Sequence, residues 1–262
     1  MTIMTTPPTT ASPTTTPGRE VLATDTVAWL DDDGQDGALA RDRRGWSVIS
    51  SIPDVSETGQ SDTVWRAFFA RSAGQLLGLC DDGGLLLLFQ TDTRGGGLWV
   101  DKSAMITAGV VAAGGVLLMR KIICRRPPGT TSTRRAAYTH LLVYGRGPLP
   151  ASLPDTVADV IDDGGPVTWT RGVGLYATRA ACDIVARYSP GTRTIADPFC
   201  GEGMILAVAN ERGFNAFGIE RQRKRAEQAR RLKVTDIRLD SRDDKRDSHR
   251  SGPPDSPSGD DG

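Results

Sequence analysis

An acid, two glycines and a second acid lie close together in the segment TRTIADPFCGEGMILAVANERGFNAFGIE, late in the 262-residue chain. Asp197 follows a β-branched run, Gly201 and Gly203 come next, and Glu220 ends the apolar segment AFGIE. Glycine adopts backbone dihedrals that other residues avoid, so such a turn can approach a ligand closely. A carboxylate at the end of the following strand can accept hydrogen bonds from both hydroxyls of a ribose.

The same segment departs from the two common nucleotide-binding patterns. No third glycine follows Gly203 at the dinucleotide position, and no Lys-Ser/Thr pair follows as in a phosphate-binding loop. The pattern therefore favours a nucleoside that carries an ammonium group over a pyrophosphate. Asp197 would then hold the ammonium group or order water beside it. A plain glycine turn between a strand and a helix is the alternative interpretation.

Strand-like and helix-like segments alternate along the chain and would have to position this motif. Compact apolar runs predict strands at 47–50, 85–91, 116–124 and 138–145. Helical periodicity predicts helices at 62–80, 102–113 and 176–189. In the first of these helices we expect Asp62 to be the N-cap and Val64, Phe68 and Leu76 to share one face. The alternation predicts an α/β fold with a mostly parallel twisted sheet.

The two ends of the chain differ in composition from the rest. Residues 1–18 are mostly Thr, Pro, Ser and Ala, and residues 240–262 are mostly Asp, Arg, Ser, Gly and Pro. Such segments cannot bury enough apolar surface to offset the entropy of ordering, so we expect both to be disordered tails. Residues 19–239 are then a single domain.

Charge and cysteine content exclude several classes of protein. Lys+Arg and Asp+Glu both number 32, so the net charge gives no nucleic-acid signal. The four cysteines lack the paired spacing of a zinc site, so no metal is expected.

Apolar runs are too short for a membrane span, and no secretory signal begins the chain. These two features predict a soluble intracellular protein, cytoplasmic or nuclear. A Thr/Ser-rich N-terminus leaves weak organelle targeting open, and nothing indicates the oligomeric state.

The motif DPFCGEG, followed by GIE, resembles the cofactor site of S-adenosylmethionine-dependent methyltransferases. More narrowly, it is similar to the Asp-Pro-Phe-x-Gly-x-Gly signature of enzymes that methylate exocyclic amines of adenine or cytosine in nucleic acids. The resemblance implies a Rossmann-like class I methyltransferase fold with helices on both faces of the sheet. It also implies S-adenosyl-L-methionine as cofactor, bound by Asp197, Phe199, Gly201, Gly203 and Glu220.

The late position of this motif resembles the circularly permuted order of the β-class DNA methylases, over about residues 20–235. In that order the catalytic strand lies upstream of the cofactor strand. The resemblance places Asp25 near the adenine of the cofactor. It also places the loop TRGVG before the last predicted helix, where Gly172 and Gly174 would let the loop close over the methionine end. An ordinary turn is the alternative for these two glycines.

The resemblance places the catalytic motif after the strand WSVIS. Family members carry Asp/Asn/Ser-Pro-Pro-aromatic there, and this chain has Ser51-Ile52-Pro53-Asp54. Ser51 and Pro53 match the pattern, whereas Ile52 replaces a proline and Asp54 replaces the aromatic residue that stacks on a flipped base. Ser51 would accept a hydrogen bond from the amine, and Asp54 could take its proton. A strand that ends in a proline turn is the alternative.

Basic and aromatic residues in the central segments suit phosphate contact and stacking on single-stranded bases. A solvated loop is the alternative interpretation of these segments. The candidate substrate-binding residues are Arg94, Trp99, Lys102, Arg125, Arg126 and Tyr138.

Three functions remain open at this point. The first is methylation of a base amine in nucleic acid, with RNA favoured over DNA because the chain lacks a separate target-recognition domain and Asp54 breaks the motif. The second is methylation of a small molecule or a protein. The third is a cofactor-binding but inactive nucleic-acid-binding partner.

Overall fold

The computed structural model describes residues 16–32, 40, 43–148 and 157–237. Most of both predicted tails, at 1–15 and 240–262, lies outside the described residues. Within the described ranges, no helix combines the length and the apolar character needed to cross a membrane.

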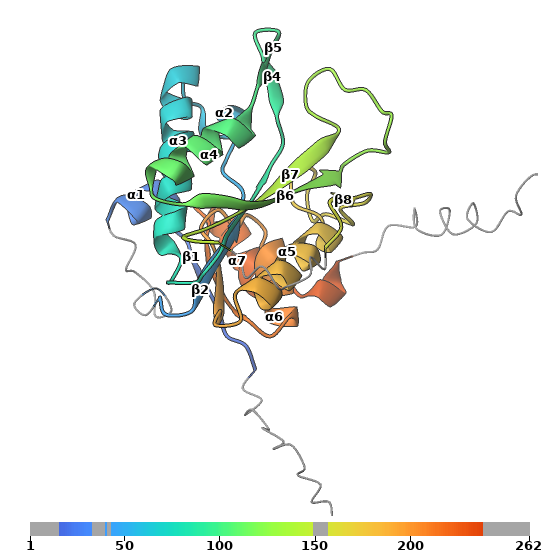
Figure 1. Ribbon diagram of the computed structural model, residues 1–262. Helices are drawn as coiled ribbons and strands as arrows, with labels where there is room; N and C mark the ends of the chain where they lie inside the picture. The colour runs from blue at the N-terminus through green and yellow to red at the C-terminus, as the bar shows by residue number, and fades with distance from the viewer. Residues whose placement is uncertain (1–15, 33–39, 41–42, 149–156, 238–262) are drawn as a thin grey trace, which may run out of the picture.

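A single eight-stranded sheet organises the structure, with strand order β1-β10-β9-β2-β3-β7-β6-β8 (Figure 1). The strands are β1 (Arg19–Leu22), β2 (Trp46–Ser50), β3 (Leu86–Gln90), β6 (Val116–Cys124), β7 (Tyr138–Gly145), β8 (Val160–Ile161), β9 (Thr194–Asp197) and β10 (Asn215–Ile219). All strands from β1 to β3 in this order run parallel, β7 runs antiparallel to both of its neighbours, and β8 is parallel to β6. The predicted mostly parallel sheet is confirmed.

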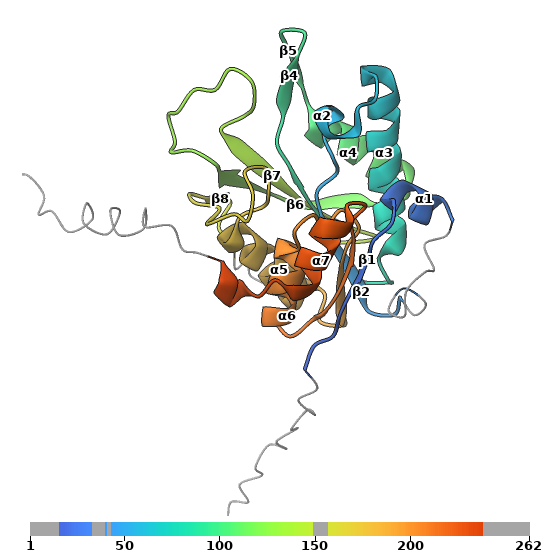
Figure 2. The same cartoon turned by 180° about the vertical axis from the view of Figure 1, so that it is seen from behind.

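Helices cover both faces of the sheet, as predicted (Figure 2). One face carries α1 (Thr26–Asp31), α3 (Asp62–Leu79) and α4 (Lys102–Ala112), and the other carries α5 (Leu175–Tyr188), α6 (Met204–Glu211) and α7 (Arg223–Arg231). Alternate residues of β2 face the two helix layers. Val48 packs under α3, and Ile49 packs toward α5 and α6. This alternation follows from the period of two along a strand.

Two smaller elements lie beyond the sheet. The short helix α2 (Val55–Thr58) follows β2, and the strands β4 (Thr93–Gly95) and β5 (Leu98–Val100) form a projecting hairpin (Figure 1). None of the strands predicted from the sequence lies in this second segment. Gly96 and Gly97 both have positive φ, 58° and 81°, which allows the tight reversal between the two strands.

The start of α3 differs from the expectation in two respects. Ser61 is the N-cap, and Asp62 is the first helical residue, where it pairs with Arg66. Val64 is 54% exposed, because the buried stripe starts at Trp65 and continues through Phe68. Phe68 and Phe69 are both buried although they are neighbours, so the exposure of Val64 reflects its place in the first turn, ahead of the buried part of the helix.

Two glycine-to-alanine substitutions provide a matched test of this packing. A Cβ at Gly109 in α4 would lie 2.0 Å from the carbonyl oxygen of Ala70 in α3, whereas one at Gly78 would meet nothing within 4 Å. We expect Gly109→Ala to lower the free energy of unfolding by about 1–3 kcal/mol through overpacking. Gly78→Ala should raise it by up to about 1 kcal/mol through helix propensity. Urea denaturation measures both, and equal effects would contradict the close approach of α3 and α4.

Candidate functional site

Two adjoining cavities open at the carboxyl ends of the parallel strands. Each has a volume of about 420 Å³. The walls of both include Ser51, which follows β2, together with Glu57 and Arg171. In an open α/β sheet this edge is where ligands bind. We name them the Glu220 cavity and the Arg125 cavity after one residue that lines each.

The Glu220 cavity has acidic and aromatic walls. Glu220 follows β10, and one of its carboxylate oxygens accepts a hydrogen bond from the backbone N–H of Gln222 at 2.8 Å. Asp25 caps α1 by accepting from the N–H groups of Val27 and Ala28. The next residue, Thr26, donates its hydroxyl to the carbonyl of Pro198, which fixes α1 against the turn after β9. The rings that line this cavity belong to Phe68, Trp169 and Phe199.

The two glycines of the turn have different roles. Gly201 lines the Glu220 cavity with a φ of 53°. Gly203 lines neither cavity, and it begins α6 with a φ of 89°. A Cβ at Gly203 would lie 2.7 Å from the Cα of Ala229, so this glycine permits close packing of α6 on α7. Only the first glycine therefore lets the backbone face a ligand.

Asp197 is a buried link between two strands. The hydroxyl of Ser50, at the end of β2, donates to Asp197 Oδ1 at 2.6 Å, and the N–H of Phe199 donates to the same atom at 3.2 Å. The side chain is 2% exposed and lines neither cavity. Burial raises the pKa of Asp197 to about 7, against the opposing effect of its two hydrogen bonds. Direct contact between Asp197 and a cofactor ammonium group stays a prediction.

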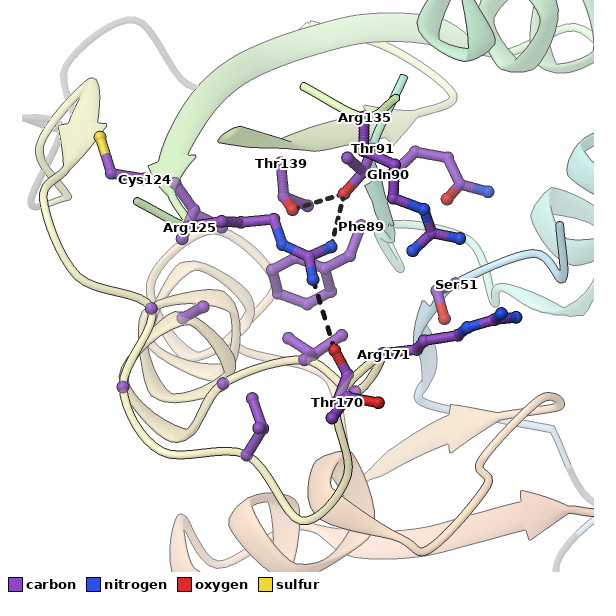
Figure 3. Close-up of a pocket in the computed structure, with 18 of the residues that line it drawn as sticks. Ser51, Phe89, Gln90, Thr91, Cys124, Arg125, Arg135, Thr139, Thr170 and Arg171 are labelled. Carbon is purple, nitrogen blue, oxygen red and sulfur yellow. Dashed lines mark hydrogen bonds between the residues drawn. The ribbon is translucent and has the colours of Figure 1, made fainter. Parts of the chain in front are cut away.

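The Arg125 cavity extends from Ser51 across the ends of β3 and β6 (Figure 3). Phe89 and Gln90 come from β3, and Gln90 Nε2 donates to the carbonyl of Ile52 at 2.8 Å. Gly172 and Gly174, in the loop before α5, line this cavity and not the Glu220 cavity, so closure of their loop over the methionine end of the cofactor stays a prediction. A Cβ at Gly174 would lie 2.0 Å from the carbonyl oxygen of Gly164, so this loop packs closely on the segment before it.

The turn from Ser51 to Asp54 is held rigidly from several sides. Pro53 offers its carbonyl to Trp65 Nε1 at 3.1 Å, and Pro53 lines the Glu220 cavity. Asp54 Oδ1 accepts from the N–H of Val55 at the start of α2. Asp54 Oδ2 binds Lys102 Nζ at 3.0 Å and a guanidinium nitrogen of Arg135 at 3.1 Å. Both carboxylate oxygens help to hold the turn, and proton abstraction by Asp54 stays a prediction.

The candidate substrate residues divide into two groups. Lys102 and Arg125 line the Arg125 cavity, although Lys102 is only 2% exposed and burial lowers its pKa despite its contact with Asp54. The other four line neither cavity: Arg94, Trp99, Arg126 and Tyr138. Arg94 stacks over Trp99 at 4.8 Å on the hairpin, and Tyr138 meets the ring of His140 edge-on.

The residues of the site that were not among the sequence-based candidates include Arg135, Trp169, Arg171 and Arg225. Arg225 from α7 stacks on Trp169 at 4.7 Å, and both line the Glu220 cavity. Arg171 approaches Glu57 at 3.5 Å at the junction of the two cavities. Trp169 immediately precedes the predicted TRGVG loop, which is the one signal that could have identified it.

Three solved structures with the same fold are named here, two of them described as a DNA modification methylase and a DNA methyltransferase. One is TTHA0409 of Thermus thermophilus, which is assigned provisionally as a DNA modification methylase and is complexed with S-adenosyl-L-methionine. It is 17% identical to this chain with a TM-score of 0.58, and the aligned region covers 81% of this chain and 91% of TTHA0409. The M1.HpyAVI–SAM complex is 13% identical with a TM-score of 0.54, covering 82% and 100%. The cytosine-N4-specific PvuII DNA methyltransferase is 11% identical with a TM-score of 0.60, covering 88% and 92%.

These likenesses establish that the chain has the class I methyltransferase fold predicted from its sequence. No protein-family profile and no curated protein matches the chain in sequence.

Asp197→Asn tests the cost of burying this carboxyl group. Asparagine keeps an oxygen that can accept from Ser50 and Phe199 but cannot ionise. The pKa of Asp197, about 7 in the folded state, lies above its ordinary value of 3.8, so the folded state binds more protons than the unfolded state. The wild-type free energy of unfolding therefore falls as the pH rises through this window.

We expect the stability of the asparagine variant relative to wild type to increase across that window and to level off above pH 7, by up to about 4 kcal/mol. Urea denaturation at a series of pH values measures the difference. Asp82→Asn, at an exposed turn, is the control and should show no such trend. A difference that stays constant with pH for Asp197→Asn would contradict the raised pKa.

Proposed function

We propose that this protein is an S-adenosylmethionine-dependent methyltransferase that acts on an exocyclic amine of a nucleobase in nucleic acid. One observation carries the proposal: Ser51 lies on the shared wall of two cavities at the ligand-binding edge of the sheet. One cavity suits a nucleoside cofactor, and the other suits its acceptor. A group transferred between two bound molecules needs such a junction, because alignment of the reacting atoms supplies much of the catalysis.

The residues of the Glu220 cavity fit the proposed cofactor. Glu220 has one carboxylate oxygen with no hydrogen bond from the described residues, so it can accept from ribose hydroxyls. Apolar and aromatic walls from Ile219 and Phe199 suit an adenine ring, and Asp25 lies at the same cavity. Carboxylates near a sulfonium and an ammonium group are electrostatically favourable. Two of the solved structures with this fold are complexes with S-adenosylmethionine.

The chemistry demands little of the protein. When bound, the cofactor supplies a methyl group that is already activated on a sulfonium. The amine nitrogen is the nucleophile, and its lone pair is delocalised into the ring of the base. Ser51 Oγ can accept a hydrogen bond from one N–H and so draw the nitrogen toward tetrahedral geometry. The carbonyl of Ile52 already accepts from Gln90, but a carbonyl has two lone pairs and can accept from the amine as well.

The solved structures with this fold bear on the nature of the acceptor. Two of the three solved structures named above are described as a DNA modification methylase and a DNA methyltransferase, which favours a nucleic acid. The sequence-based preference for RNA over DNA stays a prediction. Methylation of a small molecule or a protein, and an inactive cofactor-binding partner, are alternatives that the following experiment distinguishes.

Two variants test the proposed roles. We expect Glu220→Gln to weaken binding of S-adenosylhomocysteine by roughly tenfold to a hundredfold, because charge-assisted hydrogen bonds to ribose are lost. Ser51→Ala should lower kcat by roughly a hundredfold and leave cofactor affinity nearly unchanged, because its hydrogen bond acts on the reacting amine. Calorimetry measures binding. Transfer of labelled methyl to total tRNA, rRNA, genomic DNA, protein and small-molecule pools measures activity.

Glu227→Gln in α7 and Ser61→Ala before α3 are the matched controls, because both residues are exposed and line neither cavity. Absence of cofactor binding by the wild-type protein would refute the proposal. Cofactor binding without label in any pool would favour the inactive partner, and label only in protein or small molecules would favour the second alternative.

A further inference from the structure

The guanidinium of Arg125 points into its cavity with only neutral partners. Arg125 follows β6, and its two terminal nitrogens donate to Thr91 Oγ1 at 3.2 Å and to the carbonyl of Thr170 at 3.4 Å (Figure 3). A guanidinium has five N–H donors, so these two bonds leave most of its capacity unused. Among the described residues, no carboxylate lies within salt-bridge distance of Arg125. Arg125 therefore has an unmet preference for an anion.

The other charges of the cavity do not meet this preference. Burial first, and then the neighbouring positive charges of Arg135 and Arg126, lower the pKa of Arg125. Of the carboxylates that line this cavity, Asp54 is engaged by Lys102 and Arg135, Glu57 approaches Arg171 at 3.5 Å, and Asp163 accepts from the N–H of Gly165. Like charges that converge without a shared counter-ion repel each other, and this repulsion is relieved when an anion binds between them.

The position of Arg125 relative to Ser51 limits which ligands could contact both residues. Ser51 follows β2, and the guanidinium is bonded to Thr91, which follows the adjacent strand β3. Ser51, the proposed acceptor of the amine N–H, therefore lies at the end of one strand, and the Arg125 guanidinium lies at the end of the next. Neighbouring strands are about 4.8 Å apart. Phe89 and Gln90 lie on β3 and line the same space. A ligand with an amine at one end, a ring in the middle and an anion at the other end suits this order.

We propose that Arg125 binds a phosphate of the same nucleotide whose amine is methylated, inside the cavity. This inference rests on the proposed function, since it assumes that the Arg125 cavity holds the acceptor. Arginine binds phosphate through two parallel N–H···O bonds, which fixes orientation as well as charge. The acceptor is then a nucleotide with its phosphate drawn into the cavity, and a nucleoside without phosphate is a poor ligand.

Calorimetry with the full-length protein saturated with S-adenosylhomocysteine tests this assignment. The probes are cytidine with cytidine monophosphate, and adenosine with adenosine monophosphate. For at least one pair we expect the phosphate to tighten binding to wild type by roughly tenfold to a hundredfold, and Arg125→Gln to abolish this increment. Arg120→Gln is the control, because it removes the same charge from an exposed residue of β6, the strand that Arg125 follows, and Arg120 lines neither cavity. It should retain the increment.

Arg125→Lys takes the place of Arg125→Gln if the latter fails to fold, since lysine keeps the charge but loses the planar fork and should keep only part of the increment. An equal loss in Arg120→Gln and Arg125→Gln would overturn the inference in favour of general surface charge. Weakened S-adenosylhomocysteine binding by Arg125→Gln, with the phosphate increment intact, would identify the cofactor carboxylate as the anion instead. Wild-type protein that binds S-adenosylhomocysteine but shows no phosphate increment refutes this inference alone, whereas failure to bind S-adenosylhomocysteine refutes the proposed function.

Discussion

The hydrogen bond from Ser50 Oγ to Asp197 Oδ1, at 2.6 Å, joins two segments that are 147 residues apart in the chain. It lies where β2 and β9 end side by side in the sheet. The turns that follow these two strands carry Ser51 on one side and Phe199 with Gly201 on the other. Parallel pairing forces the carboxyl ends of both strands to one edge, so the proposed catalytic turn early in the chain meets the proposed cofactor-binding turn late in it.

Burial of the Asp197 carboxyl group is energetically unfavourable, but the hydrogen bond that this group accepts fixes the geometry of the site. A carboxyl group with 2% exposure is disfavoured in its charged form, and the two hydrogen bonds that it accepts offset only part of that cost. In return, the link fixes the relative position of the two cavities that meet at Ser51. A transfer reaction that depends on alignment gains from such rigidity, since small displacements of the reacting atoms are costly in rate.

Local patterns were sufficient to predict much of this arrangement. The strands at 116–124 and 138–145 agree with the structure at both ends, because compact apolar runs bounded by glycine or proline are strong signals. Asp25, Phe199, Gly201 and Glu220 were expected together and line one cavity. The basic run after β6 was recognised, but the sequence could not decide that Arg125 lines the cavity and the adjacent Arg126 does not. That difference depends on tertiary contacts with Thr91 and the loop before α5.

The replacement of an aromatic residue by Asp54 becomes intelligible from these contacts. Asp54 and Lys102 form a largely buried ion pair, and Arg135 from a distant loop completes it. A buried pair of this kind is destabilising unless its remaining hydrogen bonds are satisfied, and Asp54 satisfies its own by capping α2. The turn therefore offers charge where the related pattern offers a ring. The cavity supplies a ring from the next strand instead, since Phe89 lines it beside Ser51, so an acceptor base would find its apolar contact on β3 rather than on the catalytic turn.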